Sequence, residues 1–237
     1  MKVLVLGASG ATGKLVVHQL AKRNIQVRIV VRESAILPAQ IFDAKNVEII
    51  KGNISEFDID KVKELIKDCD SVISCLGHNI NFKGLFGQPR KLVYNAVKTT
   101  IEAIKAENKS IKFILMGTTA YTNKSIGETN TFNEKIIFSL LKVVLPPHKD
   151  NMLAGDYLLY KLGSEAGIEW VVVRPDSLID EEKESLYDVY NNKIRSPISN
   201  PGKTSRINVS HFMADLVTND KLWQEWKHKT PVIYNNE

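Results

Sequence analysis

The strongest chemical signal in the sequence is a glycine-rich loop near its start. The loop has the form G-x-x-G-x-x-G and consists of Gly7, Ala8, Ser9, Gly10, Ala11, Thr12 and Gly13. It follows an apolar run and precedes a helical pattern, the context in which such a loop binds a dinucleotide. There the first glycine permits a sharp turn, the second leaves room for a pyrophosphate, and the third brings helix and sheet together. The helix N-terminus adds free N–H groups and a positive dipole end. The alternative is a tight turn without a ligand, and three glycines would be costly there.

The end of the next apolar run, 26–32, bears on the choice of dinucleotide. NAD sites usually place Asp or Glu at this point to accept from the ribose 2′-hydroxyl. This run ends in Arg32, which could pair with a 2′-phosphate, whereas Glu33 comes one residue late and should point away. We therefore expect NADP(H) to be preferred over NAD(H). The alternative is that Arg32 is an exposed charge at the end of a strand.

The elements that must position these residues alternate between strand and helix patterns. The expected strands are 2–7, 26–32, 47–53, 71–77, 111–117 and 168–175, with a last edge strand at 232–234. The expected helices are 12–23, 60–67, 89–107 with Pro89 in its first turn, 150–166 and 211–219. This order predicts an α/β fold with a doubly wound parallel sheet, the Rossmann fold. We expect one domain over 1–237 with a small irregular C-terminal part, since residues 196–206 are rich in turn formers.

Composition narrows the class of protein. The chain has 237 residues, 32 Lys and Arg, 27 Asp and Glu, and two cysteines, Cys69 and Cys75, which we expect to be reduced and packed. Six basic residues and no acid occur in residues 1–32; either a phosphate-rich ligand or a solvated helix face would explain this bias. No basic stripe is interleaved with aromatic residues, and no apolar run approaches the roughly 20 residues that span a bilayer. We expect a soluble cytoplasmic protein with no signal peptide, no metal site, and neither nucleic acid nor membrane as partner.

Beyond the glycine loop, several segments resemble the atypical short-chain dehydrogenase/reductases. These segments are the strand-end VR, KGN after the third strand, CLG at 75–77, ILMGTTAY at 114–121 and LGSEAGIEWVVVRPDSL at 162–178. The arrangement is most similar to the group of biliverdin reductase B (flavin reductase) and the NmrA-like proteins, over about residues 1–217. The resemblance implies that Asn53 contacts adenine, that Ile54 packs on its ring, and that Leu76 and Gly77 line the path to the nicotinamide. It also implies that Thr119 occupies the position of the active-site serine, and that Thr118, which precedes it, and Pro175, near the nicotinamide amide, bind the cofactor.

The catalytic group is where the resemblance is weakest. Tyrosine-dependent members of the superfamily carry Tyr-x-x-x-Lys on the helix before the sixth strand, where the lysine lowers the pKa of the phenol. Tyr157 and Lys161 have this spacing, although they lie slightly out of register. The alternative is a core tyrosine beside a solvated lysine. Asp156 stands near the position where flavin-reductase-like relatives carry His, and His148 is the nearby histidine, either catalytic or a surface residue at a helix start.

Two further segments could form the substrate pocket. Residues 121–147 are long for a connection and could be a lid or wall, or else an ordinary packed helix and loop. Residues 78–87 contain Phe82 and Phe86, which could stack on a planar ring or simply anchor the loop.

Two functions fit these observations. The first is an NADP(H)-dependent oxidoreductase that moves hydride to a small planar acceptor such as a flavin or quinone, with the cofactor supplying the chemistry. The second is an NmrA-like regulatory protein that binds the dinucleotide without turnover and signals to a protein partner. A nucleotide-sugar epimerase is less favoured, because such enzymes have a larger C-terminal lobe.

Overall fold

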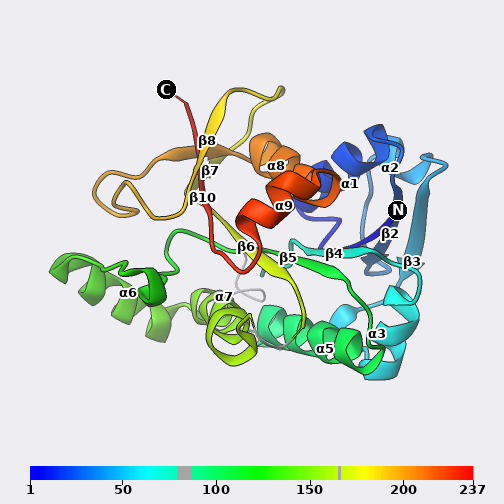
Figure 1. Cartoon of the computed structure of the whole chain (residues 1–237), viewed down its shortest axis with the longest axis horizontal. Helices are drawn as coiled ribbons and strands as arrows, with labels where there is room; N and C mark the ends of the chain where they lie inside the picture. The colour runs from blue at the N-terminus through cyan, green and yellow to red at the C-terminus, as the bar shows by residue number, and fades with distance from the viewer. Residues whose placement is uncertain (79–86, 165–166, 237) are drawn as a thin grey trace.

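A mostly parallel sheet forms the centre of the molecule (Figure 1). The computed structural model describes residues 1–78, 87–164 and 167–236. Within them the sheet has the strand order β3-β2-β1-β4-β5-β6-β10-β8. Its strands are β1 (Lys2–Leu6), β2 (Gln26–Val31), β3 (Val47–Lys51), β4 (Ser71–Ser74), β5 (Lys112–Met116), β6 (Trp170–Pro175), β8 (Tyr187–Tyr190) and β10 (Val232–Asn235). All neighbours are parallel except β10 and β8, and β7 (Ser177–Ile179) pairs with β9 (Lys203–Ser205) in a separate ribbon. The predicted Rossmann-type α/β fold is confirmed.

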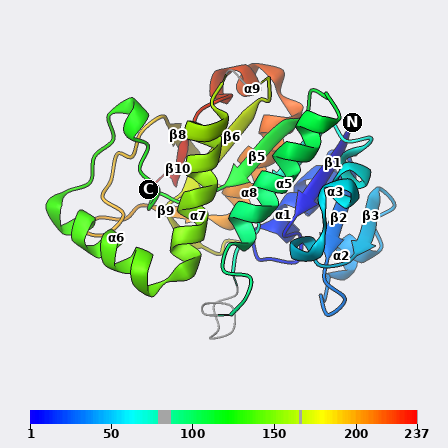
Figure 2. The ribbon, with the colours of Figure 1, turned by 90° about the horizontal axis from the view of Figure 1, so that it is seen from below.

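Helices cover both faces of the sheet. One face carries α1 (Gly13–Lys22), α8 (Arg206–Thr218) and α9 (Asp220–Trp226), and the other carries α3 (Ile59–Ile66), α5 (Leu92–Ala106) and α7 (Pro146–Asp156). Seen from below, α5 and α7 lie side by side, while α6 (Phe132–Val144) lies apart from the sheet at one end of the molecule (Figure 2). The short α2 (Ala39–Phe42) precedes β3.

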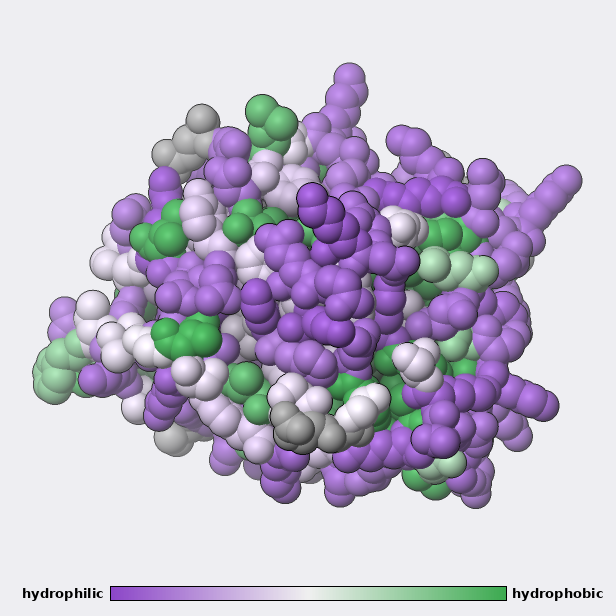
Figure 3. Space-filling view, in the orientation of Figure 1, coloured by the Kyte–Doolittle hydropathy of each residue, from purple (hydrophilic) through white to green (hydrophobic). Residues whose placement is uncertain are grey.

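Alternating side chains of the strands fill two hydrophobic cores. On β1, Val3 and Val5 pack beneath α1 and α8, whereas Leu4 and Leu6 pack beneath α3 and α5, and all four are almost completely buried. Such burial on both faces is why the strands read as continuous apolar runs in the sequence. The face shown in Figure 3 is largely hydrophilic, and its apolar residues are dispersed in small patches.

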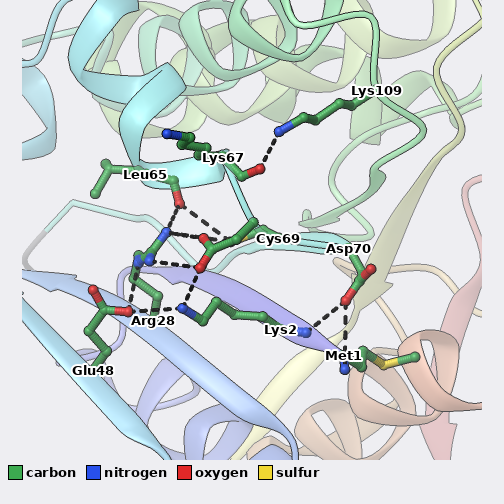
Figure 4. A network of polar contacts seen from close by, with 10 residues as sticks. Met1, Lys2, Arg28, Glu48, Leu65, Lys67, Cys69, Asp70 and Lys109 are labelled. Carbon is green, nitrogen blue, oxygen red and sulfur yellow. Dashed lines mark hydrogen bonds and ion pairs between the residues drawn. The ribbon is translucent and has the colours of Figure 1, made fainter.

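A polar network ties the N-terminal ends of the first strands to the helix layer (Figure 4). Arg28 on β2 donates to Glu48 on β3 at 2.9 Å, to Asp68 at 2.7 Å and to the Leu65 carbonyl at 2.6 Å. Lys2 on β1 donates to the same two carboxylates. Because parallel strands end together, this network lies at the edge of the sheet opposite the glycine loop.

Two helix boundaries and the place of one strand differ from the sequence predictions. The helix expected at 89–107 is α5, and it begins at Leu92 rather than in a turn containing Pro89. The Asp150 carboxylate accepts from the N–H groups of Val93 and Tyr94 and fixes the first turn there. The helix expected at 150–166 starts at Pro146 as α7 and becomes a π-helical turn over Tyr157–Leu162.

The predicted edge strand at 232–234 is the third difference. It is β10 and lies inside the sheet, since β8 pairs along its outer side. β8 itself falls in the part that the sequence left irregular, and the turn-rich stretch 196–206 contains β9.

Candidate functional site

The glycine loop joins β1 to α1, and at two of its positions the backbone geometry permits only glycine. Gly7 has a φ of +78°, and a Cβ there would lie 2.6 Å from the Cys75 carbonyl group at the end of β4. A Cβ on Gly13 would lie 2.1 Å from the Gly7 oxygen. Gly10 differs, because the nearest atom to its Cβ position is the Gly7 oxygen at 3.2 Å and the rest of the space is open. The loop therefore makes a tight turn at Gly7 and a close contact with the helix at Gly13, and the space beside Gly10, between them, is open.

A cleft of about 450 Å³ lies above this loop, at the carboxyl ends of β1 to β4. It brings together eight of the predicted cofactor residues, namely Gly7, Ser9, Gly10, Arg32, Asn53, Ile54, Leu76 and Gly77. The other loop residues do not line it: Ala8, Thr12 and Gly13 are buried and Ala11 is exposed. Ligands of open α/β sheets bind at this edge.

The first turn of α1 suits an anion. No side chain caps it and it contains no acidic residue, so no side chain competes with an anion for its positive dipole end, although the N–H groups of Lys14 and Leu15 donate to the carbonyls of Gly10 and Thr12. The backbone and the open position at Gly10 thus fit the pyrophosphate of a dinucleotide. The nicotinamide ring of such a dinucleotide would supply the hydride in a redox reaction.

Arg32 is the cationic side chain of the N-terminal segment that reaches the cleft. It is exposed and makes no ion pair with any residue that the structure describes. The other basic residues of segment 1–32 serve elsewhere: Lys2 and Arg28 belong to the network of Figure 4, and Arg23 pairs with Asp215 at 2.7 Å. A phosphate-rich ligand therefore accounts for one of those six charges.

Asn53 and Ile54 form the side of the cleft beyond β3. The Asn53 side chain accepts from the Ser55 N–H at 3.3 Å and donates to Glu56 at 2.8 Å, which caps a short 3-10 turn. This local cap holds both residues at the cleft, with Ile54 half-buried.

A His–Asp pair at the cleft was missed by the sequence prediction. The ring nitrogen Nε2 of His78 lies 2.8 Å from the Asp150 carboxylate, which is fully buried. The sequence had placed His78 only in a substrate wall, and 72 residues separate the two partners, so no local pattern connects them. Phe82 and Phe86, from the same predicted wall, lie outside the described residues.

A second, larger cavity of about 910 Å³ lies between α5, α6, α7 and the segment that follows β5. Residues 121–147 contribute much of its wall, in agreement with one of the two interpretations of that segment. Its aromatic lining is Tyr94, Tyr121, Phe138, Tyr157 and Tyr160. Neighbouring residues at the start of α5 line the two cavities: Leu92 lines the cleft, and Lys91 and Tyr94 line the second cavity.

The candidate catalytic pair Tyr157 and Lys161 lines this second cavity. Tyr157 is buried with its ring edge-on to Tyr94, and burial raises its pKa above the ordinary value. Lys161 is exposed. A tyrosine activated for proton transfer needs a lowered pKa, so the environment works against the role predicted for Tyr157.

Two other titratable groups flank the pair. Asp156 lines the cavity, and burial raises its pKa. His148 lies in the first turn of α7, half-buried and stacked on Phe138, and burial lowers its pKa. His148 is therefore at a helix start, as expected, but it is packed rather than a surface residue.

The remaining predicted active-site residues line neither cavity. Thr119 is buried and its hydroxyl donates to Asp176 at 3.1 Å, while its N–H donates to the Pro175 carbonyl. Thr118 precedes it, half-buried, and its hydroxyl accepts from the Ala120 N–H. These contacts hold β5 and β6 together at their carboxyl ends.

Three further features concern the rest of the described chain. Cys69 and Cys75 are free and buried, and burial raises the pKa of Cys75 to about 12. Residues 1–78, 87–164 and 167–236 hold no group of His, Cys, Asp or Glu arranged for a metal ion. Their helices are also too short or too polar to cross a membrane.

The fold and the cleft define a dinucleotide-binding protein of the Rossmann type. The model of the NAD(P)H-binding family matches residues 7–220, so the chain belongs to that family. This match confirms the NAD(P)H-binding part of the resemblance.

Similar proteins agree with this assignment. The chain is 26% identical over 202 residues to the Arabidopsis thaliana protein At2g34460, whose name calls it chloroplastic and uncharacterized; the match covers 79% of this chain and 66% of that protein. Among solved structures, a candidate NADH-flavin reductase from Streptococcus pneumoniae, SP1627, has a TM-score of 0.71 at 19% identity, with all of both chains covered.

Two more solved structures share the fold. The anaerobilin reductase ChuY from Escherichia coli O157:H7 has a TM-score of 0.70 at 15% identity, covering 100% of this chain and 98% of that one. A short-chain dehydrogenase/reductase from Veillonella parvula in complex with NADP has a TM-score of 0.70 at 13% identity, covering 99% and 94%.

Proposed function

We propose that this protein is a reductase that uses NADP(H) in preference to NAD(H) and passes hydride to a small planar acceptor. The observation that carries the proposal is that neighbouring residues of α5 line both cavities, Leu92 the cleft and Lys91 and Tyr94 the second cavity. One cavity has the cradle for a dinucleotide, and the other has an aromatic lining suited to a flat ring. A ligand in each would bring a hydride donor and an acceptor next to each other.

In this proposal the residues of the chain bind and orient rather than supply the redox chemistry. The glycine loop and the first turn of α1 hold the pyrophosphate, and Arg32 pairs with the 2′-phosphate of NADP(H). The acceptor takes hydride from the reduced nicotinamide and a proton from water, so it needs no activated acid from the protein. Two observations support this: burial raises the pKa of Tyr157, and Lys161 is exposed.

The same two observations also favour a second candidate, a regulatory protein of the NmrA-like kind that binds the dinucleotide without consuming it. Such a protein needs the cleft and no proton-transfer group. It would relay its state to a protein partner, whereas the reductase needs only a small-molecule substrate.

One experiment separates the two candidates. NADPH and NADH are titrated into the purified protein, and NADPH oxidation is then followed with a panel of flavins and quinones. Tight NADPH binding with oxidation that depends on the acceptor supports the reductase. Tight binding with no oxidation by any acceptor rejects the reductase in favour of the regulatory protein.

A further inference from the structure

The helix α6 presents a stripe of large apolar side chains to solvent. The stripe consists of residues four apart, which lie along one side of a helix, and each of them is between 49% and 76% exposed: Phe132, Ile136, Leu140 and Val144. Another side of the same helix packs against the molecule, where Phe138 is buried. A helix that is apolar on a packed side and also on an exposed side has more apolar surface than its own fold uses.

The loop beside the first turn of α6 extends this exposed apolar surface. The Ser196 hydroxyl donates to the Glu134 carboxylate, so the loop contacts α6, and the flanking residues Ile194 and Ile198 are both exposed. In Figures 1 and 2, α6 and segment 189–205 lie together at the end of the molecule far from α2. Six of the ten exposed large apolar residues in the described part of the chain thus belong to this end. Single exposed apolar residues are normal, whereas such a gathering marks an interaction surface.

The net charge of the protein is concentrated at the same end. Residues 121–149 and 189–205 contain seven Lys and Arg and two Glu, an excess equal to the formal charge of +5 of the whole chain, so the other residues are balanced. Both glutamates are buried: Glu128 pairs with Arg174, and Glu134 accepts from the Thr131 N–H and the Ser196 hydroxyl. All lysines of 121–149 are exposed, namely Lys124, Lys135, Lys142 and Lys149. The apolar stripe therefore lies in a positively charged surface.

Exposed apolar side chains surrounded by positive charge fit an anionic lipid surface. A helix at such a surface inserts its apolar side chains between the lipids, while its lysines contact the headgroup phosphates. A second copy of this chain fits less well, because it would bring like charges together. In addition, α6 lies at the outer end of the molecule (Figure 2), where a membrane can reach it without a matching groove.

We propose that α6 and the neighbouring loop dock the protein on the surface of a membrane that contains anionic lipids. The apolar stripe enters the headgroup region, and Lys135 and Lys142 of the same helix pair with lipid phosphates. The expectation from the sequence, that no membrane is a partner, rested on the lack of a segment long enough to span a bilayer, whereas docking on a surface needs only one amphipathic helix. This docking surface goes beyond the proposed reductase function and does not depend on it.

Cosedimentation with vesicles tests the proposal. The purified protein is mixed with vesicles of pure phosphatidylcholine, or of phosphatidylcholine and phosphatidylglycerol in equal parts. We expect binding to the mixed vesicles to be about tenfold tighter or more, with an advantage that shrinks as salt is added. No binding to the mixed vesicles, or equal binding to both compositions at low salt, overturns the proposal.

Variants then locate the docking surface. Ile136→Gln combined with Leu140→Gln removes the centre of the stripe, and neither residue lines a cavity. We therefore expect an unchanged melting temperature and NADPH affinity, with vesicle affinity about tenfold lower or more. The matched control is Ile36→Gln combined with Leu186→Gln, which removes two apolar side chains, 93% and 79% exposed, outside α6 and its neighbouring loop. Equal losses of vesicle affinity in the two double variants would overturn the role of α6.

Sedimentation velocity examines the other occupant of the stripe. We expect the protein to be a monomer at the concentrations used with vesicles. A dimer that Ile136→Gln and Leu140→Gln dissociate, in a protein that does not bind vesicles, would overturn the proposal and assign the stripe to a second copy of the chain. Failure of the reductase proposal would appear differently, as NADPH binding without oxidation by any flavin or quinone, whether or not the protein binds vesicles.

Discussion

Arg174 on β6 and Glu128 in the loop after β5 form a buried fork, with two guanidinium nitrogens facing the two carboxylate oxygens at 2.7 and 2.8 Å. The Arg174 side chain is completely buried, and it also donates to the backbone carbonyls of Tyr121 and Thr230. Burial alone would raise the pKa of Glu128, but Arg174 and the backbone N–H groups of Asn123 and Lys193 together outweigh it and the pKa is lowered. This fork fixes the segment that carries Tyr121 to the sheet.

We expect Glu128→Gln to lower the free energy of unfolding by about 3–5 kcal/mol, because it leaves a buried guanidinium without its counter-charge. Urea unfolding measures this. The control is Glu102→Gln, which removes an exposed carboxylate 3.6 Å from Lys98 and should change stability by less than about 0.5 kcal/mol. A loss at Glu128 as small as that at Glu102 would contradict the structural role of the fork.

The network of Figure 4 predicts an acid-dependent part of the stability. The hydrogen bond from Lys2, together with Arg28, lowers the pKa of Asp68 to about 2 from an ordinary 3.8. A lowered pKa stabilises the fold above the unfolded pKa, and this contribution is lost as the pH falls through the folded value. Asp68→Asn should therefore unfold at lower denaturant than wild type at pH 7, and the difference should disappear between about pH 4 and pH 2. A difference that is constant down to pH 2 would be inconsistent with this linkage.

Arg32 should set the choice between the two dinucleotides. Arg32→Ala removes the partner of the 2′-phosphate, and we expect NADPH affinity to fall about tenfold or more while NADH affinity changes little. Lys14→Ala is the matched control, since Lys14 is an exposed cation on α1 that does not line the cleft. Equal losses for both dinucleotides on changing Arg32 would argue against the proposed preference.

Alanine substitutions at two glycines of the same loop should have different effects, one on stability and the other on NADPH affinity. Gly13→Ala places a Cβ 2.1 Å from the Gly7 oxygen and should lower the melting temperature of the free protein. Gly10→Ala meets only the Gly7 oxygen at 3.2 Å and should fold nearly as well as wild type, yet lose NADPH affinity because its methyl group takes the space of the pyrophosphate. Thermal melting with and without NADPH measures both effects. Normal NADPH binding by Gly10→Ala would rule out the proposed pyrophosphate site at Gly10.

Tyr157→Phe tests the remaining catalytic hypothesis. Burial raises the pKa of Tyr157, and Lys161 is exposed, so we expect kcat to remain within about twofold of wild type with an accepted flavin or quinone. A fall of about 100-fold or more would instead assign Tyr157 a role in proton transfer. Measuring the acceptor KM alongside kcat distinguishes lost chemistry from lost packing in the cavity.

The sequence predicted the fold well because the parallel strands are buried on both faces, and their apolar runs are visible without any knowledge of the partners. The glycine loop and Arg32 were predicted for a similar reason, because each follows directly from a strand whose position is known, whereas Asn53 and Gly77 were implied by the family resemblance. Local order along the chain was sufficient for this half of the site.

The other half of the candidate site depends on contacts between segments that are distant in the sequence. The pairing of His78 with Asp150 gives no local signal, and the same carboxylate explains why α5 begins at Leu92 rather than nearer Pro89. β8 was missed because it is only four residues long, YDVY, and it forms a strand by pairing with β10, which is distant in the sequence. The second cavity likewise forms only once α7 packs on α5 and α6 packs on α7.

The place of β10 in the sheet has a consequence for how the chain is made. A ribosome delivers β6 and β8 before it delivers the strand that joins them. Until β10 emerges, β6 has an open edge that is apolar and able to pair with another chain. The nascent protein therefore keeps this open edge until β10 has left the ribosome and paired with β6, and a chaperone that shields strand edges would be useful up to that stage.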